Sequence, residues 1–425
     1  MGKGGTGMMR SVLVCALLTT SLVLAGCALG PRMIEINRLR YNDSVKVTTE
    51  RQLLLNIVRL RYIDTPSSLS VTTIAEQPEI VAGLKAIPFF TSAAAGNSFG
   101  GYAGSILPSA ELSGAVRPTL SYSPLDDQEF TRRLFTPITL EGTLYISKTT
   151  WSASTVFRLY LENMNWVSNA ETASGPTPRV APDYEEFQSG IQALQRLQDR
   201  KLMAFFSEDR EEKLTDPVPQ GAGVAAAAVE SAKAGFEYRG DSTNGWVVTR
   251  KQKQPILRIG TIPEGDADWA AFSRVFHLDP DCRSFDITTD SLDPFLAEGK
   301  GAGLRQIDLE TRSLIQVLFF VSQGVDVPAE HVASGVAPST TDADGTPFDW
   351  HKVMHGLLRV HCVAGKKPPA TAHVAVPYKG HWFYIDESDR DSKSTFSLLM
   401  ELSRLELGVR TGQQAPLLTL PLNGR

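Results

Sequence analysis

The histidines are the residues best suited to chemistry, because six of the seven lie between His331 and His381. His351 and His355 are four residues apart, so on a helix both imidazoles would lie on one face, where they could bind a metal ion. Lys352 occupies the place of the glutamate in the H-E-x-x-H pattern of metalloproteases. A metal site and ordinary surface or half-buried histidines both fit this spacing, and we favour the second. A third ligand could come from His361, His373 or His381.

An acidic cluster follows the last histidine, in the run Asp386-Glu387-Ser388-Asp389-Arg390-Asp391-Ser392-Lys393. Its four carboxylates could hold a hard cation, and Asp386 and Asp389 are the candidate ligands. However, the cluster lies between a predicted strand and a predicted helix, where acidic residues cap the helix and complement its dipole. We favour the capping role.

A G-x-S-x-G pattern occurs at Gly96-Asn97-Ser98-Phe99-Gly100. A nucleophile elbow requires a strand before the serine and a helix after it. No helix signal follows Ser98, so this pattern does not predict a nucleophile. We predict no catalytic residue and no cofactor. Whether the protein is an enzyme stays open, and we favour that it is not.

The N-terminus carries a secretory signal. Residues 1–26 contain a basic segment with Lys3 and Arg10 and then an apolar segment too short to span a membrane as a stable helix. The run Leu24-Ala25-Gly26-Cys27 resembles the lipobox of bacterial lipoproteins. This resemblance implies removal of residues 1–26, acyl chains such as palmitate on Cys27, and a short tether over residues 27–33. Ala28, rather than aspartate, follows the cysteine, which favours an outer-membrane lipoprotein facing the periplasm.

Two other cysteines remain after cleavage, Cys282 and Cys362. Both lie on predicted strands, and in an oxidising compartment they could form a disulfide. Two separate buried thiols are the alternative that we favour.

The composition is that of a globular protein with an acidic balance. The chain of 425 residues is 42% hydrophobic and has a formal net charge of −5. This acidic balance argues against a nucleic-acid partner, because proteins that bind nucleic acids usually carry a basic surface. No apolar run after Cys27 reaches the about 18 residues of a membrane-spanning helix.

The predicted fold class is α+β. An N-terminal helical and β region covers 34–171, a Pro/Ser/Gly-rich linker covers 172–182, and a C-terminal region of mixed helices and antiparallel sheet covers 183–425. The first region is predicted to begin with two helices, Ile34 to Ser44 and Thr49 to Tyr62. The second helix is expected to start with a capping box formed by Thr49 and Gln52.

The stretch from Ala86 to Ala110 has no charged residue and is rich in Gly, Ala and Ser, with aromatic residues spaced through it. Residues 67–75 before it and 111–122 after it are predicted strands. Two interpretations are open for the charge-free stretch: a membrane-facing hairpin of an oligomeric pore, or a Gly/Ser loop or soluble hairpin. We favour the second.

Three segments resemble a family of uncharacterised bacterial lipoproteins of the Gram-negative type. They run from Gln52 to Tyr62, from Arg117 to Leu125 and from Tyr378 to Phe396. The resemblance agrees with a lipid anchor and implies no catalytic residues, because that family has no established activity.

These features together predict an envelope lipoprotein that acts as a non-catalytic scaffold or interaction module. Its expected partners are a membrane, through the lipid on Cys27, and an envelope protein. Two alternatives stay open: a subunit of an oligomeric outer-membrane pore or secretion assembly, and a metal-dependent hydrolase that uses the C-terminal histidines and acids.

Overall fold

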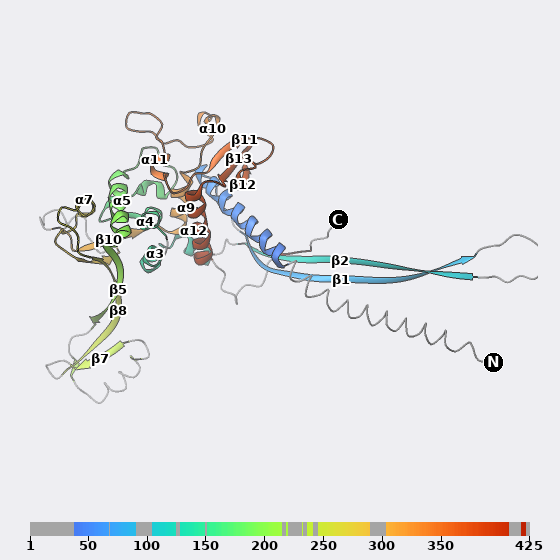
Figure 1. Ribbon diagram of the computed structural model, residues 1–425, viewed down its shortest axis with the longest axis horizontal. Coiled ribbons are helices and arrows are strands. Elements are labelled where there is room, and N and C mark those ends of the chain that lie inside the picture. The colour runs from blue at the N-terminus through green and yellow to red at the C-terminus, as the bar shows by residue number, and fades with distance from the viewer. Residues whose placement is uncertain are drawn as a thin grey trace, which may run out of the picture. The chain divides into compact units, whose positions relative to one another are not determined.

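The computed structural model describes residues 38–67, 69–90, 104–124, 128–148, 151–214, 218–219, 232, 236–240, 245–289, 303–407 and 418–421 (Figure 1). The predicted signal peptide, the predicted lipobox with Cys27, the predicted tether and Ser98 lie outside the described residues. The described chain divides into two compact units. One runs up to Pro66 and resumes at Thr131, and the other runs from Ser67 to Phe130 and takes in the C-terminal strand.

The α+β prediction is confirmed, because the chain combines helices with mixed and antiparallel sheets. The helices are 38–61, α2 (Gln128–Phe135), α3 (Leu140–Ser147), α4 (Ala153–Tyr160), α5 (Glu185–Asp199), α7 (Ala267–Val275), α9 (Leu314–Ser322), α10 (Ala329–Ala333), α11 (His351–Met354) and α12 (Arg390–Leu407). The strands are β1 (Leu69–Phe90), β2 (Gly104–Pro124), β3 (Leu161–Met164), β4 (Val167–Ser168), β5 (Met203–Lys213), β6 (Val218–Pro219), β7 (Phe236–Gly240), β8 (Gly245–Ile259), β9 (Ser284–Thr288), β10 (Gln306–Thr311), β11 (His361–Ala364), β12 (Ala372–Tyr378), β13 (His381–Asp386) and β14 (Leu418–Pro421).

The larger sheet of the first unit joins the two halves of the chain. Its order is β4-β3-β10-β9-β8-β5, with β6 and β7 also paired to β8. The short strand β3 pairs with β10, so a segment before the predicted linker is bonded to one far beyond it. The predicted division at 172–182 is therefore wrong, because backbone hydrogen bonds and a shared core cross it.

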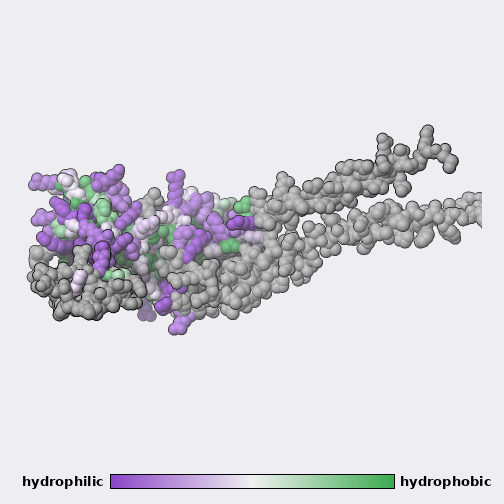
Figure 2. Space-filling model, turned by 90° about the horizontal axis from the view of Figure 1, so that it is seen from below, coloured by the Kyte–Doolittle hydropathy of each residue, from purple (hydrophilic) through white to green (hydrophobic). Residues whose placement is uncertain are grey.

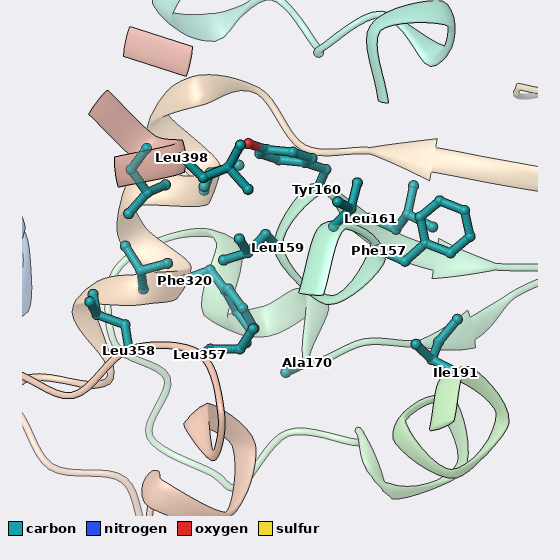
Figure 3. Packing of buried hydrophobic residues seen from close by; sticks show 14 of the residues in the cluster. Phe157, Leu159, Tyr160, Leu161, Ala170, Ile191, Phe320, Leu357, Leu358 and Leu398 are labelled. Atoms are coloured by element: carbon teal, nitrogen blue, oxygen red, sulfur yellow. The ribbon is translucent and has the colours of Figure 1, made fainter. Parts of the chain in front are cut away.

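Helices α4, α5 and α9 build the core beside this sheet. Buried residues alternate at helical spacing along α5, where Phe187, Ile191 and Leu194 have almost no exposed surface. Figure 3 shows residues of α4 and α9, such as Leu159 and Phe320, gathered in this core. One continuous cluster of buried side chains thus supports the whole unit.

A buried arginine ties several segments of the core together. Arg312 is fully buried and stands just before Ser313, the N-cap of α9. Its guanidinium donates to Ser174 Oγ and lies 4.0 Å from the ring centroid of Phe320. Burial lowers the pKa of Arg312 to about 9. The backbone carbonyls of four residues accept its other hydrogen bonds: Arg158, Leu159, Leu161 and Asn169.

The smaller sheet has the order β11-β13-β12. Lys379 and Gly380 form a two-residue turn between β12 and β13, and both have positive φ, 43° and 83°. This conformation matches the twist of the flanking strands. Phe383 and Ile385 of β13 are buried and belong to the same core cluster as α12.

The N-terminal helix differs from its prediction. Residues 38–61 form one continuous helix instead of two. Thr49 Oγ1 donates to the carbonyl of Val45, 2.7 Å away, so Thr49 bonds back along the helix and caps nothing. The segment between the predicted helices contains neither Gly nor Pro, which leaves nothing to interrupt the helix.

The second unit is a long hairpin with a short third strand. β1 and β2 pair without a register shift from Thr73↔Ser121 to Phe90↔Gly104, and β14 pairs with β2 over residues 119–122. Residues 86–90 and 104–110 belong to these strands and are not a loop, so a soluble hairpin and a membrane-facing hairpin are the interpretations that stay open for them. Residues 91–103 lie outside the described part of the chain. Among the described residues, no helix is long and apolar enough to cross a membrane.

Candidate functional site

The histidine pair predicted from spacing does not form. Helix α11 ends at Met354, so His355 lies beyond it and shares no helix face with His351. His351 Nε2 lies 2.9 Å from Asp326 Oδ1, whereas the His355 carbonyl accepts a hydrogen bond from Arg158. Over the described ranges, no group of three or more His, Cys, Asp or Glu residues could hold a metal ion.

The other histidines form separate local contacts. His331 Nδ1 lies 2.8 Å from the Tyr62 hydroxyl. His381 faces the His331 ring and its Nε2 lies 3.3 Å from Glu330. His361 lies 3.5 Å from Asp326, and His373 lies 2.8 Å from Glu387. His351 and His361 thus share the carboxylate of Asp326, and His331 is in ring contact with His381, but among the described residues these groups do not combine into a centre that could hold a metal ion.

The acidic cluster serves the start of α12. Asp389 accepts hydrogen bonds from the backbone N–H and hydroxyl of Ser392, at 3.0 and 2.6 Å, which is the geometry of an N-cap. Asp386 accepts from the hydroxyl and N–H of Ser388, and these bonds hold its pKa below the usual value. Glu387 pairs with Lys393. Oδ1 of Asp386 is thus occupied by the turn, and both carboxylate oxygens of Asp389 are occupied by the helix start.

The two cysteines are free. Cys282 lies between α7 and β9, not on the predicted strand, and Cys362 lies in β11 of the smaller sheet. Burial, together with the carboxylates of Asp326 and Glu330, raises the pKa of the Cys362 thiol to about 11. A thiol with such a pKa is protonated at neutral pH and is a poor nucleophile.

An internal cavity lies between the larger sheet and its helices and is lined only by apolar residues. Such a cavity has no group that could orient a substrate, so it is a gap in packing rather than a binding site. The residues that line the cavity are Phe157, Met164, Leu194, Phe205, Leu257, Phe272, Ile287, Ile307 and Leu309.

On the face seen in Figure 2, the coloured residues are mainly hydrophilic, with hydrophobic ones scattered among them.

The hairpin β1–β2 holds the most distinctive pattern. Residues opposite each other in an antiparallel pair lie on the same face, and the face alternates along each strand. From Ile80 to Phe90 one face carries only apolar residues and glycine; we call it the apolar face. Its six pairs are Ile80↔Gly114, Ala82↔Leu112, Leu84↔Ala110, Ala86↔Pro108, Pro88↔Ile106 and Phe90↔Gly104.

The opposite face over the same length, the mixed face, contains polar and charged positions. Lys85 is opposite Ser109, and Glu111 is opposite Gly83. The five pairs of the mixed face are Val81↔Ser113, Gly83↔Glu111, Lys85↔Ser109, Ile87↔Leu107 and Phe89↔Ser105.

The apolar face begins at a definite point. On this side the pair Pro78↔Val116 is also apolar, and the next pair towards the start of the hairpin, Glu76↔Pro118, carries a charge. Beyond Glu79, both strands run for 11 residues with the apolar face uninterrupted. A strand needs about 9–11 residues to cross the hydrocarbon core of a bilayer, so this length fits a membrane.

Among the described residues of this unit, only two strands, β1 and β2, form the outer half of the hairpin. The third strand reaches only residues 119–122. A two-stranded hairpin is marginally stable in water unless its apolar face is covered. Comparison with known proteins does not identify a covering partner: no family model, no curated protein and no solved structure matches this chain.

Proposed function

We propose that this chain is a lipid-anchored, non-catalytic protein of the bacterial envelope whose hairpin β1–β2 inserts into a membrane. The apolar face of the hairpin is the observation that carries the proposal. The lipobox ending at Cys27 supplies the anchor that would hold the hairpin close to a bilayer.

The energetics of the apolar face favour lipid over water. Each of its larger residues contributes about 1.5–3 kcal/mol when it leaves water. The face carries no charge that would have to be desolvated, and the charges of this half, Lys85 and Glu111, are both on the mixed face. Alternation of apolar and polar positions is typical of strands with lipid on one side and water on the other.

The hydrolase alternative has less support. Its predicted ligands, His351, His355, Asp386 and Asp389, contact different neighbours and serve local turns and helix ends. The envelope protein partner stays a prediction, and it is the expected occupant of the apolar face if the face does not meet lipid.

Site-directed labelling tests the proposal. We would place single cysteines at successive positions from Ile80 to Phe89 in a lipidated protein carrying Cys282→Ser and Cys362→Ser, and reconstitute each variant in liposomes. A fluorophore at even positions should be quenched by nitroxide lipids, and odd positions should react with an aqueous thiol reagent. Cysteines at Gln77 and Glu79 serve as water-exposed controls. Uniform aqueous reactivity from 80 to 89 would reject membrane insertion.

A further inference from the structure

The structure also points to what lies beside the hairpin in the membrane, an inference that rests on the proposed insertion. We infer that the hairpins of neighbouring copies of this chain pair edge to edge, β1 of one copy with β2 of the next. Among the described residues, β1 pairs only with β2, and β2 pairs with β14 only at 119–122. In hydrocarbon, unpaired backbone groups cost several kcal/mol each, so a lone hairpin cannot remain there.

Four prolines determine where the edges can pair. Pro78 and Pro88 lie in β1, and Pro108 and Pro118 lie in β2. All four belong to the same alternate set of cross-strand pairs. In an antiparallel ladder, one set exchanges hydrogen bonds within the pair and the other directs its N–H and C=O groups outward. Since proline has no N–H and the ladder between β1 and β2 is continuous, the prolines belong to the outward set.

The third strand agrees with this phase. Leu120 and Tyr122 are in the outward set of β2 and stand opposite Leu420 and Leu418 of β14. Pro421, opposite Thr119, falls in the set of β14 that faces away from β2. The strand that does pair with β2 therefore avoids placing a proline in the bonding positions.

Between its two prolines, each outer edge of the hairpin has four successive outward residues that are free of proline and can form hydrogen bonds with another strand. We call each set of four a window. In β1 the outward residues are Ile80, Ala82, Leu84 and Ala86, and in β2 they are Ala110, Leu112, Gly114 and Val116. Antiparallel pairing of one window with the other gives Leu84 opposite Leu112, and it brings Pro78 opposite Pro118 and Pro88 opposite Pro108. A shift by two residues in either direction would place a proline opposite a residue of the other window. Fewer residue pairs could then exchange hydrogen bonds between the copies.

This register preserves the two faces across copies. Outward residues of both windows are those of the apolar face and its extension to Val116, so the apolar face continues from one hairpin to the next. The mixed faces then lie together, with Lys85, Glu111 and the serines of each copy on one side. A head-to-tail contact of this kind repeats and closes into a ring when its rotation allows, which makes a pore lined by the mixed face.

Disulfide crosslinking tests the register directly. In the lipidated protein with Cys282→Ser and Cys362→Ser, the double variant Leu84→Cys/Leu112→Cys should form a ladder of covalent multimers in liposomes under a membrane-permeant oxidant. The matched control Leu84→Cys/Ala110→Cys should close within one copy and give no ladder, because these two residues pair inside the hairpin. Ala82→Cys/Gly114→Cys is a second inter-copy pair in case the first variant fails to fold.

The outcomes separate the two proposals. A ladder with 84/112 but not with 84/110 supports pairing between copies. Intact alternation in the labelling experiment without any ladder overturns this inference and leaves membrane insertion standing. Loss of the alternation itself rejects insertion. Dimers of Leu84→Cys alone, without a ladder, would overturn the head-to-tail arrangement in favour of a two-fold contact between β1 strands.

Discussion

At the scale of single residues, the first unit is built on polar side chains that serve the backbone. Arg312 binds the carbonyls where α4 ends and β3 begins, Arg158 binds the carbonyls of Val353 and His355, and Asp389 caps α12. Asp389 was a candidate metal ligand in the sequence and is structural in the fold, as are the two buried arginines. Each has consequences for stability that can be measured.

Removing the guanidinium of Arg312 should be strongly destabilising. Arg312→Met leaves several buried carbonyls without a donor, and each such group costs about 1–3 kcal/mol. We expect a loss of about 3–5 kcal/mol in the free energy of unfolding, measured by urea denaturation. Arg305→Ala is the control, since Arg305 is 79% exposed and its ion pair with Asp279 should contribute about 0–1 kcal/mol. Equal effects of the two substitutions would contradict the role of Arg312.

Asp266 should make stability depend on pH in acid. It caps α7 and pairs with Arg200, and hydrogen bonds from Arg200 lead the causes that lower its pKa to about 2. Because the folded pKa lies below the unfolded value, its stabilising effect is present above pH 4 and is lost as the pH falls towards 2. Asp266→Asn should remove that part of the acid sensitivity in thermal melts. An unchanged acid profile would count against it.

The thiols of the mature protein provide a count. If Cys282 and Cys362 are free and Cys27 carries lipid, the denatured, unreduced protein should titrate with two thiols per chain. No thiol would mean that the two cysteines pair. Three thiols would mean that Cys27 is not acylated, and mass spectrometry of the N-terminal peptide would then identify its state.

At the scale of elements, local signals predicted more than long-range ones. The apolar run of α9, the strand β12 and the turn at Lys379–Gly380 were predictable because each depends on neighbouring residues. The pairing of β3 with β10 could not be predicted, because the sequence of two such short strands does not specify which distant strand each one pairs with. The alternation in β1 was obscured by apolar residues such as Ile87 and Phe89 on the mixed face.

The two faces of the hairpin should respond differently to charge. Leu84→Lys puts a charge on the apolar face, where it costs about 2–4 kcal/mol near the bilayer midplane. Ser109→Lys puts the same charge on the mixed face and should be tolerated. Protection of the hairpin from external protease in liposomes measures insertion. Equal protection of both variants would exclude a lipid-facing role for the position of Leu84.

At the scale of the whole molecule, the two units should be separable. Glu79 is directly opposite Ala115, so residues 80–114 can be replaced by an Asn-Gly turn that joins the paired strands. The shortened protein should keep the unfolding midpoint of the first unit and its attachment to membranes through the Cys27 lipid. It should lose the protease-protected fragment. Release of this variant from membranes would show that the lipid alone does not hold the protein.

The position of β14 in the chain has a consequence for the order in which the strands pair during folding. The strand that closes the β2 edge at residues 119–122 is separated from β2 along the chain by the Thr131–Gly408 part of the first unit, so the base of the hairpin can close only after all of that segment has been synthesised. Non-local strand pairing of this kind is slow, because a long loop must close first. The pairing of β14 with β2 is therefore expected to form later than the pairing of β1 with β2, which are neighbours in the chain.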